Sequence, residues 1–272
     1  MTTVQPFTKV LHAYRQSCVF VCMDRFCRFM DGFADQELPV AYSIPVLYED
    51  SEILIVDKPW DVRVDGDFSV TVETLVREGL GRVMDRFRLC NQLDYSTSGV
   101  LVLGKTSKGA GNCNKLFQTR LTRKWYLAVG SGSADLIGWQ SVTASISEVP
   151  NDIRMQIDPN GKLCESLILP IRKIQIGGNT CTLFLVRLVT GRRHQIRLHL
   201  KQLGFPIVGD ATYGENDRTQ CPRMMLHAWK LVLPFPKQTV TADAVPHEFF
   251  SHTDVTWEQV ANDIQIGTSN PT

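Results

Sequence analysis

The chain has 272 residues, of which 43% are hydrophobic and 21% charged, as expected for a globular protein with a core of its own. It has no run of about 18 uncharged apolar residues, which excludes an ordinary transmembrane helix, and we expect no membrane partner. Its eight cysteines form no CxxC pair, so they lack the usual spacing of zinc and thioredoxin-like sites and are expected to be free thiols.

The formal net charge of +1 conceals an uneven distribution of charge. Residues 95–134 and 166–209 contain no Asp or Glu, whereas Lys and Arg recur through both segments. Such segregation predicts a basic face for a polyanion. Ordinary solvated charge explains the same pattern, so charge alone leaves a nucleic-acid partner open.

Residues 1–45 look like an extension that precedes the main domain. The first 23 residues contain no acid and include Lys9 and Arg15, a composition that resembles an organellar presequence. A short helix that packs on the domain is the favoured alternative. We therefore expect a cytoplasmic or mitochondrial protein with an extension over 1–45, a main domain over 46–240 and a C-terminal tail over 241–272.

Hydrophobic periodicity and turn residues predict strands and a few helices from residue 51 onward. The predicted strands lie at 51–57, 100–103, 125–129 and 227–233, and near 142–147, 166–175 and 180–189. The predicted helices lie at 69–80, 106–119 and 191–203, and the last is followed by Gly204 and Pro206. After Pro236 the signals weaken. Because strands outnumber helices and do not alternate with them regularly, the sequence predicts an α+β fold.

The first segment that suggests chemistry is the loop from Leu93 to Gly99, which precedes a predicted strand. It places Asp94 after an apolar residue and before small or hydroxylated residues that can fix a carboxylate at a cleft. An Asx-turn at the entrance of a strand explains the same residues and is the favoured interpretation of this segment alone.

The second segment runs from Thr190 to Lys201, and nearly all of it lies in the helix predicted over 191–203. On a helix, Arg193, Arg197 and Lys201 share one stripe, where like charges repel, so this pattern favours anions opposite them, either phosphates or a buried carboxylate. His194 and His199 suggest a metal ion. A spacing of five residues suits a shared ion poorly on a helix, however, and no acid lies nearby, so we expect no metal.

The third segment is the predicted strand around Tyr126, which follows Arg123 and Lys124. A tyrosine ring beside a basic cluster can stack on a nucleobase, a contact worth about 1–3 kcal/mol. Packing of the same ring in the core is an equally good explanation at this point.

Together these segments resemble the RluA family of pseudouridine synthases. The run from Gln92 to Gly99 is similar to that family's H-R-L-D-x-x-T-S-G signature, and 124–128 is similar to its K-x-Y-L-A block. Residues 191–200, 203–210 and 213–214 resemble the third block, and 225–228 resemble the L-H-A strand that follows. The blocks keep their order from about residue 53 to residue 233.

The resemblance implies a pseudouridine synthase fold of the α+β class: a long, bent, mainly antiparallel sheet with flanking helices and a central catalytic cleft within residues 46–240. It implies that Asp94 is the essential aspartate, Tyr126 the active-site tyrosine and Arg197 the basic residue that holds Asp94 ionised and aimed. The implied reaction isomerises uridine in ribosomal, transfer or messenger RNA to pseudouridine and needs no cofactor. A monomer is the default expectation.

The resemblance and the basic segments together suggest a set of residues that contact RNA. These are Lys58, Gln92, Arg123, Lys124, Arg192, Arg193, His194 and Lys201. Two departures from the family pattern stand out: Asn91-Gln92 replaces His-Arg, and Asp61 replaces the Gly of K-P-x-G. They motivate a second hypothesis, an RNA-binding protein with the same fold and little or no catalysis. A third, a glycoside or nucleoside hydrolase, needs a second carboxylate within roughly 5–9 Å of the first, which Asp210 could supply through the fold.

Overall fold

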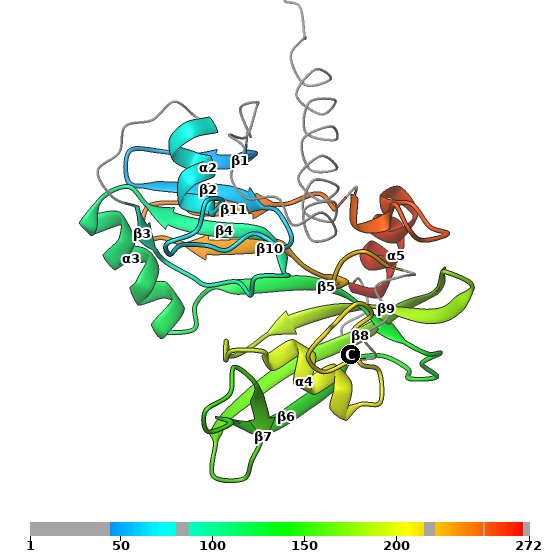
Figure 1. Cartoon of the computed structure of the whole chain (residues 1–272). Coiled ribbons are helices and arrows are strands. Elements are labelled where there is room, and N and C mark those ends of the chain that lie inside the picture. The colour runs from blue at the N-terminus through cyan, green and yellow to red at the C-terminus, as the bar shows by residue number, and fades with distance from the viewer. Residues whose placement is uncertain (1–43, 80–86, 215–220, 247, 269–272) are drawn as a thin grey trace, which may run out of the picture.

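The computed structural model describes residues 44–79, 87–214, 221–246 and 248–268 (Figure 1). The predicted extension over 1–45 therefore lies outside the described residues, apart from its last two positions. No helix within the described ranges is long and apolar enough to cross a membrane.

The described residues form one eleven-stranded sheet with helices packed on it (Figure 1). The strands are β1 (Val46–Glu49), β2 (Ile53–Lys58), β3 (Arg88–Leu89), β4 (Ser98–Gly104), β5 (Arg123–Ser131), β6 (Gln140–Glu148), β7 (Met155–Ile157), β8 (Lys162–Ile176), β9 (Asn179–Leu188), β10 (Leu226–Pro234) and β11 (Thr239–Asp243). The helices are α2 (Val72–Gly79), α3 (Ser107–Gln118), α4 (Gln195–Gln202) and α5 (Trp257–Thr268), with a 3-10 turn η1 (Glu248–Phe250).

The order of strands across the sheet is β1-β2-β4-β10-β5-β9-β8-β6-β7, with β3 beside β4 and β11 beside β10. Every pairing of these strands is antiparallel except that of β4 with β10. The predicted α+β class with a mainly antiparallel sheet is confirmed.

In the first half of the sheet, both faces are covered, which explains its continuous apolar runs. On β2, Ile53 and Ile55 pack in a cluster with side chains of α3, whereas Leu54 and Val56 pack in another cluster with side chains of α2. Helix α3 begins where Thr106 accepts a hydrogen bond from the Gly109 amide at 2.9 Å. This half is a rigid base for the loop that carries Asp94.

In the second half, α4 lies over β6, β7 and β8, and α5 packs against β8. Ile196 and Leu200 of α4 join the largest core cluster, which β5, β8 and β9 also line. Strand β11 and helix α5 lie after Pro236, where sequence signals are weak. The core cluster also takes in Val260 and Ile264 of α5, so this segment packs on the domain.

The one parallel pairing brings the Asp94 loop to the centre of the sheet. It joins Ser98 with His227 and Gly99 with Ala228. Gly99 has a φ of +111°, and a β-carbon there would lie 2.2 Å from the Ala228 carbonyl oxygen, so only glycine allows this approach. Because β10 also pairs with β5, the loop before Gly99 lies close to Tyr126.

Candidate active site

Asp94 lies in the loop between β3 and β4, with 23% of its side chain exposed. The Thr97 amide donates a hydrogen bond to the Asp94 carbonyl oxygen at 3.1 Å, which closes a turn. Beneath the loop, Lys58 Nζ donates to the Tyr95 carbonyl oxygen at 3.0 Å and to the Pro59 carbonyl oxygen at 2.8 Å. The loop is therefore held from below while its carboxylate stays within reach of a ligand.

Arg197 of α4 binds two carboxylates at once. Its Nη1 donates to Asp94 Oδ2 at 3.1 Å, and its Nε and Nη2 donate to the two oxygens of Asp210 at 2.7 Å each. The Asp210 side chain is 1% exposed and that of Arg197 8%. Burial by itself raises the pKa of Asp210, but the Arg197 guanidinium and two backbone amides outweigh it and hold this pKa below its ordinary value. Asp210 therefore anchors the arginine, and Asp94 is the carboxylate left facing outward.

Helix α4 begins at Gln195, four residues later than predicted. His194, just before it, has a φ of 57°, and the buried Gln195 amide oxygen accepts hydrogen bonds from Thr190 Oγ1 and the Arg192 amide at 2.8 and 2.9 Å. These contacts shape 190–194 as a loop. The prediction that Arg193 shares a helical stripe with Arg197 and Lys201 is therefore wrong. Arg193 precedes the helix and donates to the Ile153 carbonyl oxygen.

His194 lies between Asp94 and Tyr213. Its Nδ1 is 2.7 Å from Tyr213 Oη, and its Nε2 is 3.9 Å from Asp94 Oδ2. Burial is the main reason why the pKa of His194 is lowered to about 4, although the Asp94 charge opposes it. His199 points elsewhere, with its Nδ1 3.0 Å from Ser166 Oγ. Among the described residues, no three His, Cys, Asp or Glu side chains gather as a metal site would require.

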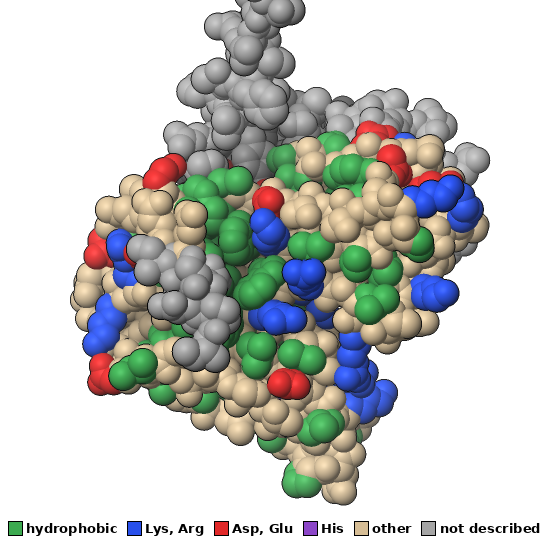
Figure 2. Space-filling model, turned by 180° about the vertical axis from the view of Figure 1, so that it is seen from behind, with side chains coloured by type: hydrophobic (Ala, Val, Ile, Leu, Met, Phe, Trp, Pro, Cys, Tyr) green, Lys and Arg blue, Asp and Glu red, His purple; other side chains and the backbone are tan. Residues whose placement is uncertain are grey.

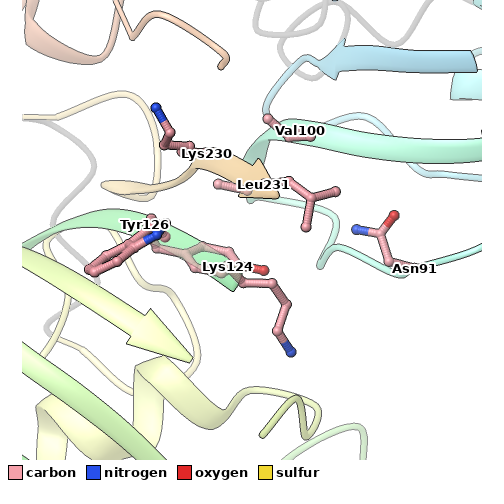
Figure 3. A pocket seen from close by; sticks show the side chains of 8 residues that line it. Asn91, Val100, Lys124, Tyr126, Lys230 and Leu231 are labelled. Carbon is pink, nitrogen blue, oxygen red and sulfur yellow. The ribbon is translucent and has the colours of Figure 1, made fainter. Parts of the chain in front are cut away.

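Tyr126 projects from β5 and is half-buried beside Asp94. Burial first, and then the negative charge of Asp94, raise the pKa of Tyr126 well above that of a free phenol, so the hydroxyl keeps its proton at neutral pH. A shallow pocket adjoins it where β4, β5 and β10 meet, lined by Tyr126, Lys124 and Asn91 among others (Figure 3). Asp94 does not line this pocket.

The structure separates the residues predicted to contact RNA into surface and interior groups. Gln92, Arg123, Arg192, Arg193 and Lys201 are exposed, and His194 is largely buried in the site. Lys124 is half-buried, with Nζ 3.3 Å from the Thr190 carbonyl oxygen, and burial lowers its pKa to about 8.

Lys58 differs from the prediction, because it is 0% exposed and its ammonium bonds to backbone carbonyls under the Asp94 loop, out of reach of a phosphate. Lys and Arg side chains also gather near the middle of the rear face of the molecule, among apolar ones (Figure 2).

Three functional features were missed by reasoning from the sequence. Nothing assigned a role to Tyr213, although it contacts His194, and Asp210 was considered as a hydrolase acid and not as the anchor of Arg197. The Arg63 guanidinium stacks over the rings of Phe68 at 4.2 Å and of Tyr95, the residue after Asp94, at 5.4 Å. Exposed aromatic residues around a loop arginine were the available signal for this stack.

Comparison with known proteins agrees with this geometry. Residues 52–202 match the family described as RNA pseudouridylate synthase. The chain is 31% identical over 237 residues to human RNA pseudouridylate synthase domain-containing protein 1, covering 79% of this chain and 74% of that protein. It is also 31% identical over 196 residues to the dual-specificity RNA pseudouridine synthase RluA of Vibrio vulnificus, covering 71% and 78%. The chain belongs to the RluA family of RNA pseudouridine synthases.

A solved structure supports the same assignment. Human RNA Pseudouridylate Synthase Domain Containing 1 superimposes with a TM-score of 0.72 at 27% identity, covering 87% of this chain and 99% of that one. The RluA family comprises isomerases that act on RNA. The two departures from its signature have local explanations here. Asp61 has a φ of 52°, the left-handed conformation that glycine favours, and Asn91 Oδ1 accepts a hydrogen bond from the Val102 amide at 2.8 Å.

Proposed function

We propose that this chain converts uridine in RNA to pseudouridine and that Asp94 is the group that acts at the sugar. The supporting observation is an outward-facing carboxylate held by Nη1 of Arg197, whose Nε and Nη2 both donate to buried Asp210. In the reaction the C1′–N1 bond breaks, the C1′–C5 bond forms, C5 loses a proton and N1 gains one. The atoms balance without oxidation, so a carboxylate that acts as base or nucleophile is sufficient.

Tyr126 would receive the detached uracil. Its ring is fixed on β5 next to Asp94, which suits stacking on a base that must turn within the site. Because its raised pKa keeps the phenol protonated, the hydroxyl is suited to donating a hydrogen bond to the uracil more than to removing the C5 proton. Tyr126→Phe would therefore retain RNA binding and lower the rate less than a change at Asp94.

The alternatives fit the site less well. A hydrolase needs a free second acid to activate water, but Asp210 is 1% exposed and bonded by both oxygens to Arg197. A protein that only binds RNA does not need a carboxylate that repels phosphate. The left-handed φ of Asp61 and the hydrogen bond of Asn91 give these two positions a role in the loop structure, and exposed Gln92 is the departure on which the RNA-binding alternative still rests.

The substrate would be an RNA whose target uridine is turned out of its stack. Exposed Arg192, in the loop before α4, and exposed Lys201, in the last turn of α4, would hold the neighbouring backbone. Ribosomal RNA is the first substrate to test, because a relative from Nitrosomonas europaea, 30% identical over 210 residues, is named ribosomal large subunit pseudouridine synthase D.

The test is nucleoside analysis of total RNA from cells that lack this protein, after incubation with wild type, Asp94→Asn or a surface control, Lys237→Gln. Pseudouridine is expected from wild type and the control but not from Asp94→Asn, which should bind RNA within about threefold of wild type. Product from Asp94→Asn would refute the role of Asp94, and free uracil from wild type would favour the hydrolase.

A further inference from the structure

The contacts of Tyr213 determine which nitrogen of His194 carries the proton. Tyr213 Oη accepts a hydrogen bond from the Met155 amide at 2.6 Å, so its own proton can go to the Met155 carbonyl oxygen at 3.1 Å or to His194 Nδ1 at 2.7 Å. The nitrogen is the nearer acceptor. If it accepts, the neutral ring carries its proton on Nε2.

The charges around the ring favour the same tautomer. Nε2 lies 3.9 Å from Asp94 Oδ2, and a bare nitrogen lone pair there would repel the carboxylate, whereas N–H attracts it. Arg197 and Arg193 discourage a second proton on the ring, and Asp94 and Asp210 favour one. In this mostly buried ring, the neutral form with a proton on Nε2 can accept a hydrogen bond from Tyr213 at Nδ1 and direct an N–H toward Asp94.

His194 is also held in an arrangement that needs support from its surroundings. Its φ of 57° is uncommon for a residue other than glycine, and its side chain makes no capping hydrogen bond to α4 although it occupies the capping position. The imidazole instead packs edge-on against Tyr213, with ring centroids 5.4 Å apart. The backbone is therefore strained in a way that turns this side chain into the site.

We propose that His194 is a positioning residue for Asp94: its Nε2–H, fixed by Tyr213, closes on Asp94 Oδ2 when RNA is bound and keeps the carboxylate aimed at the sugar. The separation of 3.9 Å is too long for a hydrogen bond, and a shift of about 1 Å makes one. Arg197 gives Asp94 one hydrogen bond, from Nη1, while its Nε and Nη2 bind Asp210, so a second donor to Asp94 from another side chain matters. The kinetic part of this inference rests on the proposed function, and the tautomer does not.

The first test reads the tautomer directly, by nitrogen-15 NMR of the imidazole rings in RNA-free protein at pH 7. The chain has six histidines, and His194→Gln identifies the signal. A protonated Nε2 with an unprotonated Nδ1 is expected for His194. A proton on Nδ1, or a doubly protonated ring, would overturn the inference whether or not the protein is active.

The second test compares His194→Phe, which keeps a ring without a donor, with His194→Gln, which keeps a neutral N–H donor. Single-turnover rates at saturating RNA should fall about 10- to 100-fold for Phe and recover to within about fivefold of wild type for Gln, with RNA Kd values within about threefold. Exposed His252→Phe is the matched control.

A merely structural role predicts a different result, in which Phe and Gln reduce the rate equally, and that result would overturn the inference. Full activity of His194→Phe would also overturn it, while Asp94→Asn remaining inactive would leave the proposed function intact. If wild type makes no pseudouridine but the Nε2 proton is found, the proposed function fails and the structural part of the inference stands.

Discussion

Replacing each of the two carboxylates on Arg197 by Asn should destabilise the protein to very different extents. Asp210 is 1% exposed and makes two bonds of 2.7 Å to the guanidinium, so Asp210→Asn leaves a buried, poorly compensated cation. Breaking such a pair costs about 3–5 kcal/mol, which corresponds to a fall in Tm of about 6–20 °C in a domain of this size. Asp94 is 23% exposed with one bond of 3.1 Å, so Asp94→Asn should cost at most about 1 kcal/mol.

The assay is urea unfolding followed by circular dichroism at pH 7, with Asp243→Asn as a control in an exposed ion pair, that of Lys230 with Asp243. The expected order of lost stability is Asp210 well above Asp94 and Asp243. Asp94→Asn should be folded but inactive. The division between an anchoring and a reacting carboxylate would be refuted if the Asp94 and Asp210 substitutions lowered the unfolding free energy equally. It would also be refuted if Asp210→Asn left the unfolding free energy unchanged.

Gly99→Ala should lower the unfolding free energy by about 3 kcal/mol, because its β-carbon would lie 2.2 Å from a backbone oxygen of β10. Gly111→Ala should raise it by about 0.5–1 kcal/mol, because Gly111 lies in α3 with open space around it, and urea unfolding measures both changes. Buried His227, with a pKa lowered to about 3, takes up a proton readily only when unfolded, so its contribution to stability should be full above about pH 6.5 and fall by about 1.4 kcal/mol per pH unit below it. His227→Gln should therefore reduce the change in unfolding free energy between pH 7 and pH 5, and an unchanged difference would contradict this. Lys201→Gln should reduce the salt dependence of RNA binding by about 0.7–0.9 in log–log slope, and exposed Lys237→Gln should leave it unchanged.

Much of the fold could be predicted from the sequence, because the buried strands β2 and β4 are continuous apolar runs that a core requires on both faces. The segment after Pro236 gave weaker signals, since β11 is short and alternates buried with exposed residues. Its position follows from pairing with β10, a long-range contact that local periodicity does not encode.

The site could be predicted only in part, because motifs indicate residues and not the contacts that the fold gives them. The motifs indicated Asp94, Tyr126 and Arg197, and the structure brings all three together. The sequence did not show that Arg197 is shared with Asp210, or that Lys58 points inward, because these depend on which side chains the fold brings into contact. The start of α4 was misplaced because helix periodicity continues through 191–194, while the buried Gln195 amide fixes those residues as a loop.

The central claim, that Asp94 isomerises uridine in RNA, is tested most directly by tritium release from RNA labelled at uridine C5. Wild type and Asp94→Asn would be assayed side by side on total RNA from cells lacking the protein, after both are shown to be folded. Release by wild type alone is the predicted result. Equal release by Asp94→Asn, or none from wild type on any RNA pool that it binds tightly, would contradict the account.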